Sequence, residues 1–160
     1  MIPIADAPIV SHEMVVIIRP SFKKICEQDP CRAALLNHLL YWIGQKAKGQ
    51  ETEKIRSGEV YWYGSNADIC SAGLDDSWSM WKVRKEIRAL VECGLIGQRH
   101  NLAKGWDREY HYFFGEEQGL ILRVACQEHH ICLCHLGLSA DVLHLLKTVN
   151  AFAVFSRCIC

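Results

Sequence analysis

The segment from Ser79 to Phe114 constrains the fold of this chain most, because a complete helix signal is followed directly by a hairpin signal. Ser79 is a good helix cap, and Gly94 fits the left-handed position that ends many helices. Apolar residues recur between them at helical spacing, and this face comprises Met80, Val83, Ile87, Leu90 and Val91. We therefore predict a helix over 79–93 whose opposite side carries basic residues and a tryptophan.

Elements on both sides of this helix complete a recognisable order. Two strands are predicted after it, over 95–99 and 109–114, and an aromatic strand is predicted before it, over 60–63. Ser65 then caps a short helix over 66–72, and a turn leads into the long helix. Strand, short helix, turn, long helix and hairpin form the order of a winged helix-turn-helix, a mainly α, α+β fold with a β-hairpin wing.

The N-terminal part supplies a further long helix to the core. Asp29 and Pro30 stand at the favoured N-cap and N1 positions, and apolar residues repeat at helical spacing from Cys31 to about Lys48. Ahead of it we predict a short strand over 14–18 and a short helix capped by Ser21. The expected organisation is a loose leader (1–13), the winged helix-turn-helix domain (14–115) and a Cys/His-rich tail (116–160) with a further helix over 140–149.

Charge separates along the chain although its total is balanced. The 160 residues include 18 basic and 18 acidic side chains, which gives a formal net charge of zero. Between Lys82 and Arg108, however, seven basic residues face three acidic ones. This local excess predicts one positive face on an otherwise neutral molecule.

Cysteine usage and the N-terminus predict a cytoplasmic protein. The first residues lack a basic n-region, and the apolar run over 14–18 is too short for a signal peptide or a membrane span. The nine cysteines are therefore expected in a reducing compartment, without structural disulfides. Four of them are predicted to be small apolar core residues, namely Cys26, Cys31, Cys70 and Cys93.

Basic residues on the long helix and the hairpin are the candidate DNA contacts. The helix set comprises Trp81, Lys82, Arg84, Lys85 and Arg88, and the wing set comprises Arg99, Asn101 and Lys104. Arginine and lysine donate to guanine edges or to phosphates, whereas the alternative for each is an ordinary solvated surface. For Trp81 two positions stay open: contact with bases or sugar, or packing onto the wing or the short helix.

Neither a metal site nor a catalytic site is expected. Cys126, His130, Cys132 and Cys134 lie in a stretch rich in zinc-ligand residue types, but their spacing matches no standard zinc knuckle. Phosphate-binding glycine loops, nucleophile elbows and paired catalytic carboxylates are also lacking from the sequence. We expect a binding protein that needs no cofactor.

Several segments together resemble the winged-helix domain of phage- and plasmid-type replication initiators, relatives of the N-terminal domain of DnaD-like primosome proteins. The likeness spans about residues 15–114 and ends at Phe114. The matching segments, in chain order, are Arg19–Phe22, Cys31–Trp42, Ser79–Ile96 and Trp106–Arg108 with Tyr110 and Tyr112.

The resemblance implies binding of double-stranded DNA in replication initiation or mobile-element maintenance, as a homodimer or with replisome proteins. Two alternatives remain open because one fold serves many functions. One is a transcriptional regulator with the same fold. The other is a winged-helix module that binds proteins and not DNA.

Overall fold

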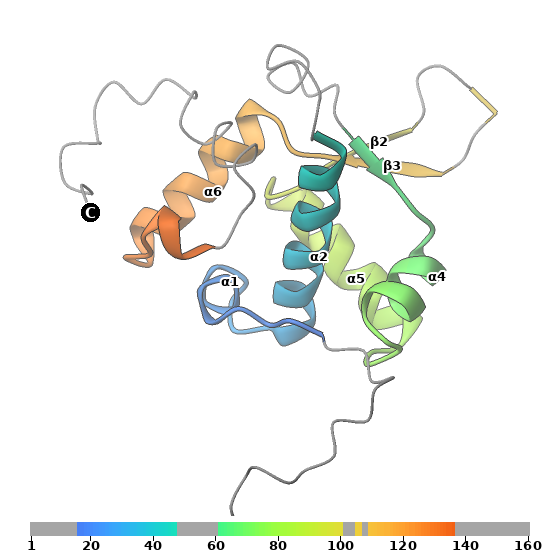
Figure 1. The fold of residues 1–160 in the computed structure, drawn as a ribbon, viewed down its shortest axis with the longest axis horizontal. Coiled ribbons are helices and arrows are strands. Elements are labelled where there is room, and N and C mark those ends of the chain that lie inside the picture. The colour runs from blue at the N-terminus through green and yellow to red at the C-terminus, as the bar shows by residue number, and fades with distance from the viewer. Residues whose placement is uncertain (1–15, 48–60, 101–104, 107–108, 137–160) are drawn as a thin grey trace, which may run out of the picture.

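A computed structural model describes residues 16–47, 61–100, 105–106 and 109–136 of this chain. Their architecture is mainly helical with an antiparallel hairpin, as an α+β fold requires. The elements follow in the order α1 (Pro20–Ile25), α2 (Pro30–Ala47), β1 (Tyr61–Tyr63), α4 (Asn66–Asp68), η2 (Ile69–Gly73), α5 (Met80–Glu92), β2 (Gly97–His100), β3 (Tyr110–Phe113), α6 (Glu116–Glu128) and η3 (Leu133–Leu136) (Figure 1).

The strands form a three-stranded antiparallel sheet in the order β1-β3-β2. Gly97 pairs with Phe113 and His100 with Tyr110, so β2 and β3 form the hairpin. The earlier strand β1 adds to the other edge of β3, where Trp62 pairs with Tyr112. The hairpin is therefore joined to the part of the chain that leads into α4.

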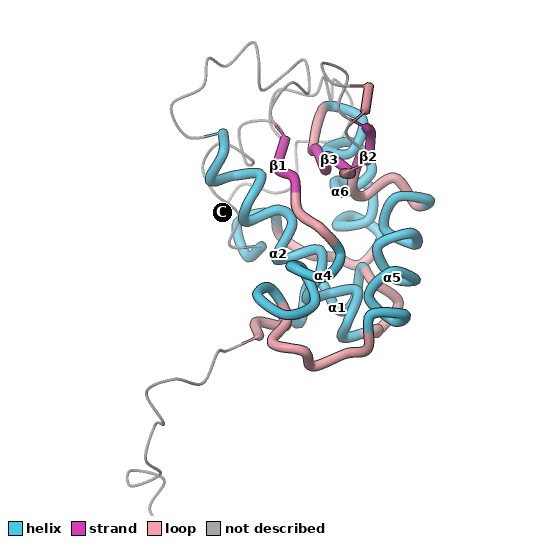
Figure 2. Tube along the Cα trace, turned by 90° about the vertical axis from the view of Figure 1, so that its right-hand side faces the viewer, coloured by secondary structure: helices cyan, strands magenta, loops and turns pink. Residues whose placement is uncertain are grey.

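Helices α2 and α5 form the centre of the core. The apolar face predicted for α5 is buried at Val83, Ile87 and Leu90, and it meets the buried leucines of α2. Figure 2 shows α2 and α5 on opposite sides of the view, with the strands above them. One side of α5 therefore builds the core, and its other side faces solvent.

A tight turn connects the short helical segment to α5. The Ser65 hydroxyl accepts the Asp68 amide, and the Asp68 carboxylate accepts the Ser65 amide, which forms the capping box that begins α4. After η2, Asp75 and Asp76 adopt left-handed conformations with φ of 49° and 50°. Ser79 then begins α5 as predicted, since its hydroxyl accepts the Lys82 amide.

Helix α6 was not expected from the sequence. Residues 116–128 were assigned to a tail, yet Leu122 and Cys126 are buried in the same cluster as α2 and α5. Leu136 of η3 joins that cluster. The helix predicted over 140–149 lies outside the described residues, as does the leader 1–13.

Three local predictions were wrong. Val16–Arg19 form no strand, because this β-branched run pairs with no edge of the sheet; residues 14 and 15 are outside the described part. Helix α1 begins at Pro20 with Arg19 as N-cap, so Ser21 lies inside it. Cys93 is exposed, because it occupies the C-cap of α5 beyond the buried face, whereas Cys26, Cys31 and Cys70 are buried as predicted.

Candidate nucleic-acid interface

The outer side of α5 carries a stripe of exposed residues. Trp81, Arg84, Lys85 and Arg88 follow one another at spacings of three, one and three residues, which places them on one helix face. All four are exposed, while Val83, Ile87 and Leu90 are buried on the opposite face. The structure thus brings four of the eight candidate residues together, and we call this set the α5 stripe.

Trp81 makes a cation–π contact with Lys85 within the stripe. The ammonium nitrogen of Lys85 lies 5.5 Å from the centroid of the Trp81 ring, at cation–π distance. Trp81 is 71% exposed, so most of its surface faces solvent. A cationic nitrogen and a large aromatic face are therefore presented side by side.

Lys82 occupies a different environment from the stripe. Its ammonium donates to the carboxylates of Asp29 and of Glu86, the latter at 2.7 Å. Arg32 of α2 also donates to Glu86, at 2.8 Å, and pairs with Glu27 at 2.6 Å. Lys82 thus belongs to a charged network that joins α5 to the N-terminal end of α2.

The network is centred on a buried carboxylate. Glu86 is 1% exposed, and burial alone would raise its pKa. Hydrogen bonds from Lys82 and Arg32 outweigh that effect and hold the pKa below its ordinary value. The same pairing raises the pKa of Lys82, which stays charged and directed toward Glu86 and Asp29. Its charge is largely compensated within the molecule.

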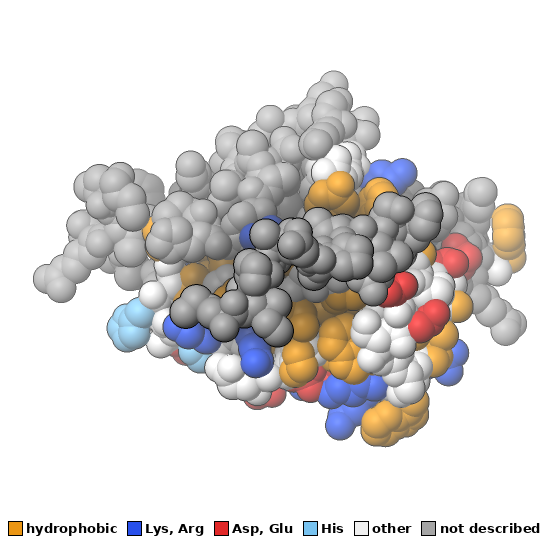
Figure 3. All heavy atoms as spheres, turned by 60° about the horizontal axis from the view of Figure 1, so that its bottom comes forward, with side chains coloured by type: hydrophobic (Ala, Val, Ile, Leu, Met, Phe, Trp, Pro, Cys, Tyr) orange, Lys and Arg blue, Asp and Glu red, His pale blue; other side chains and the backbone are white. Residues whose placement is uncertain are grey.

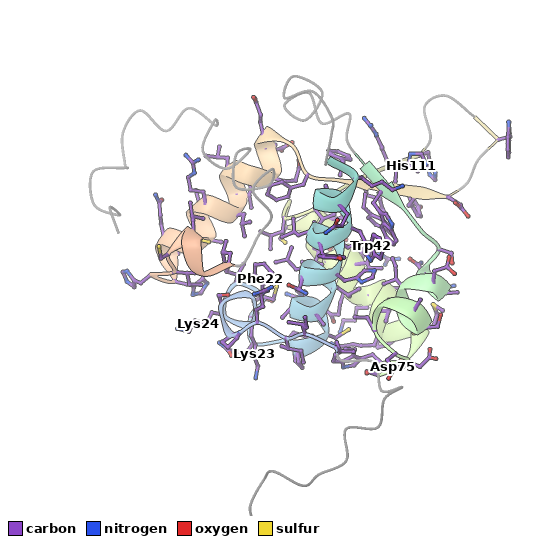
Figure 4. All side chains as sticks on the ribbon, in the orientation of Figure 1. Phe22, Lys23, Lys24, Trp42, Asp75 and His111 are labelled. Carbon is purple, nitrogen blue, oxygen red and sulfur yellow. The ribbon has the colours of Figure 1, made fainter. Side chains whose placement is uncertain are left out.

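Acidic residues limit the positive surface at one end. Asp75 and Asp76 are exposed in the turn before α5, and Asp75 lies at the edge of the molecule near α4 and α5 (Figure 4). Figure 3 shows a face on which basic, acidic and hydrophobic side chains are mixed. A polyanion would therefore be attracted most strongly to the second and third turns of α5, where Arg84, Lys85 and Arg88 lie.

The hairpin contributes further cationic and aromatic groups. Arg99 is half-buried, and its guanidinium carbon lies 5.2 Å from the centroid of the Phe113 ring. His100 stacks on Tyr110, with centroids 4.6 Å apart. Asn101 and Lys104, the other wing candidates, lie outside the described residues. Trp106, at the tip of the hairpin, is exposed. Neither Trp106 nor Tyr110 was among the candidate DNA contacts predicted from the sequence. Their position beside a predicted hairpin loop was the sequence signal that could have identified them.

The Cys/His-rich stretch forms no ligand set in the part of the chain that the structure describes. No group of three potential ligands is found among those residues. Cys126 is buried in α6, where burial raises the pKa of its thiol to about 11. His130 is exposed in the turn after that helix, Cys132 follows it, and the side chain of Cys134 lies outside the described set.

Comparison with known proteins identifies no relative of this chain. No protein family, no curated protein and no solved structure matches this chain. Within the described residues, no helix has the length and apolar character needed to cross a bilayer.

Proposed function

We propose that this protein binds double-stranded DNA through a winged helix-turn-helix, with α5 in the major groove and the β2–β3 hairpin against the backbone. The observation that carries the proposal is the α5 stripe, which combines three exposed cations with an exposed tryptophan on one helix face. A helix in this position reads base edges and phosphates with side chains at such spacings.

The order of elements supports the same function. The short α4–η2 segment and its tight turn precede α5, and the hairpin follows it directly. This is the order expected of a recognition helix between a supporting helix and a wing. The likeness to replication initiator domains makes replication initiation or mobile-element maintenance the process that we propose, with a second copy or replisome proteins as further partners.

Within the stripe, the residues have different proposed roles. Arg84, Lys85 and Arg88 contact phosphates or guanine edges, and Trp81 contacts sugar or thymine methyl groups. Lys82 keeps its carboxylate partners Asp29 and Glu86 and acts in support of the helix. Arg99, whose guanidinium lies over the Phe113 ring, is the proposed backbone contact of the hairpin.

A charge-matched pair of double variants tests this assignment. Lys85→Ala with Arg88→Ala removes two exposed cations from α5, and Lys23→Ala with Lys24→Ala removes two from α1. Lys23 and Lys24 lie at the α1 side of the molecule, away from Asp75 and the start of α5 (Figure 4). Both variants should fold normally, because every substituted side chain is exposed.

We expect the α5 variant to weaken duplex binding by about tenfold or more and to reduce the salt slope by about 2. The α1 variant should bind like the parent chain. Equal losses in the two variants would show that net charge alone matters, and unchanged binding of the α5 variant would refute the groove assignment. Fluorescence anisotropy with a labelled duplex measures both quantities.

Exposed tryptophans also favour a protein-binding module, because tryptophan is enriched at the centres of protein interfaces. Trp81 and Trp106 are the most exposed large hydrophobic residues of the described chain. Association with a replisome protein that is insensitive to salt, without affinity for DNA, would favour this second function. Footprinting at an origin or at a promoter separates replication from transcriptional control.

A further inference from the structure

We propose that the hairpin binds an unpaired base, so that the preferred DNA is a duplex that continues into a single strand. This inference rests on the proposed DNA-binding function and specifies its substrate. The α5 stripe would hold the duplex, and aromatic rings at the end of the hairpin would stack on the first unpaired nucleotide.

The first observation is the position of Trp106. This residue is 78% exposed, more than any other large hydrophobic side chain in the described residues. A Cβ added at the neighbouring Gly105 would meet no atom within 4 Å. Figure 1 shows residues 105–106 far from the helices, at the outer end of the hairpin. The ring therefore stands on the surface without contributing to the core.

A second aromatic group lies at the same end of the hairpin. Tyr110 pairs with His100 across the strands, and this is the pair nearest the loop that carries Trp106. Their rings stack with an interplanar angle of 29°, and Tyr110 is still 41% exposed. The next pair on that face, Gln98 with Tyr112, leads into the core, where Tyr112 is fully buried. Aromatic surface thus extends beyond the core toward the tip.

The chemistry of this end fits a nucleotide. Aromatic rings stack on any base, and cations beside them attract the phosphates. Arg99 supplies a cation from the opposite face of the hairpin, where it lies over the Phe113 ring, and Glu109 is the acidic residue next to Tyr110. Bases inside a duplex are stacked on their neighbours, and extruding one costs several kcal/mol. An unpaired base offers a free face without that cost.

The arrangement of elements places the strands of the hairpin above α5. Figure 2 shows β2 and β3 above α5 in the same view, with α5 along one side of the molecule. The hairpin follows α5 after Cys93–Ile96, and the aromatic group lies at the end of the hairpin away from this connection. One DNA molecule can contact the α5 stripe and this aromatic group when its duplex ends near the hairpin.

The test compares two labelled DNAs on the full chain. One is a blunt duplex, and the other is the same duplex with a short single-stranded extension. Trp106→Ala removes the ring, Trp106→Phe keeps an aromatic face, and Tyr41→Ala removes an exposed ring from α2 as the matched control. The anisotropy of each DNA gives the affinities, and 2-aminopurine at the first unpaired position reports stacking.

The parent chain should bind the extended DNA about tenfold more tightly than the blunt duplex, a ratio worth about 1.4 kcal/mol. Trp106→Ala should abolish this preference and leave blunt-duplex affinity within about twofold. Trp106→Phe and Tyr41→Ala should retain the preference, and quenching of 2-aminopurine should be lost in Trp106→Ala alone.

Equal affinity of the parent chain for the two DNAs would overturn the inference while leaving duplex binding intact. An equal loss on both DNAs in Trp106→Ala would overturn it as well, because the ring would then serve general binding. Failure of the parent chain to bind either DNA would refute the proposed function together with this inference.

Discussion

His38 lies where three elements meet, and its environment makes the stability of the protein sensitive to mild acid. Its ring makes edge-on contacts with Trp42 and Trp62, and a Cβ at Gly73 would lie only 2.6 Å from it. Its Nε2 atom is buried without a hydrogen-bond partner. Burial lowers the pKa of His38 to about 4, from an ordinary value of 6.5.

This pKa predicts a loss of stability between about pH 7 and about pH 5. In that window the unfolded chain binds a proton that the folded chain excludes, so the free energy of unfolding falls by about 2 kcal/mol as the pH falls. His38→Phe fills the same space without titrating and should remove this slope. Exposed His129→Phe is the control. Urea unfolding at the two pH values measures the effect, and an unchanged slope in His38→Phe would contradict it.

At the scale of elements, local sequence signals predicted the position of α5. They did not predict the role of Lys82, which depends on a contact with a residue distant in the sequence. Ser79 caps the helix and Gly94 ends it with φ of +77°, as neighbouring residues alone indicated. The role of Lys82 depended on Asp29, more than fifty residues away, so its position on the helix did not reveal it.

Helix α6 and the run over 14–18 likewise depend on contacts that neighbouring residues in the sequence do not reveal. The N-cap of α6 is Gly115, which has no side chain to cap the helix, and its amide donates to the Gln118 side-chain oxygen. The buried face of this helix mixes Gly119, Leu122 and Arg123, so no apolar stripe announced it. The run over 14–18 had strand composition, but its described part, Val16–Ile18, pairs with no edge of the sheet. Strand composition therefore predicts a strand only where the fold provides a neighbouring strand for it to pair with.

The contact between α2 and α5 depends on Glu86. Its carboxylate is buried between Arg32 and Lys82, and both cations lose a partner when it is removed. We expect Glu86→Ala to lower the free energy of unfolding by about 2 kcal/mol, because the partly exposed cations keep Glu27 and Asp29 as partners and can recover some hydration. Exposed Glu92→Ala, on the same helix, should change it by less than about 0.5 kcal/mol. Chemical denaturation compares them.

The decline of the free energy of unfolding at acid pH tests the same charged network. Because the pKa of Glu86 is below its ordinary value of 4.5, its stabilisation is complete above that pH and is lost as the pH falls through the folded-state value. Glu86→Ala should therefore show a flatter decline below about pH 4.5 than the parent chain. A decline of equal steepness in both would contradict a stabilising role for the ionised carboxylate.

At the scale of the whole molecule, α6 and η3, which follow Phe114, contribute to the core. Leu122 of α6 is fully buried, whereas Leu120, on the same helix, is 47% exposed. Leu122→Ala should cost about 3 kcal/mol through lost burial and a cavity, and Leu120→Ala less than about 1 kcal/mol. Thermal unfolding of both variants measures the difference. Equal effects would mean that α6 does not pack on the core in solution.

This packing determines how binding is studied. A fragment that ends before α6 would lose Leu122 and Cys126 from the cluster that supports α5, so the full chain is the proper sample. The coarse fold class, mainly helical with an antiparallel hairpin, followed from the sequence because α2, α5 and the hairpin have strong local signals. The extent of the core could not be predicted, because the sequence of α6 has no apolar stripe and its burial depends on packing against the rest of the core.

The salt dependence of duplex binding by the full chain, measured by fluorescence anisotropy at low and high salt, tests whether α5 carries a DNA-binding face. If Arg84, Lys85 and Arg88 each neutralise one phosphate, the logarithm of the binding constant should fall with the logarithm of salt at a slope of about −3. Absence of binding at low salt, or affinity that does not change with salt, would contradict a DNA-binding face on α5.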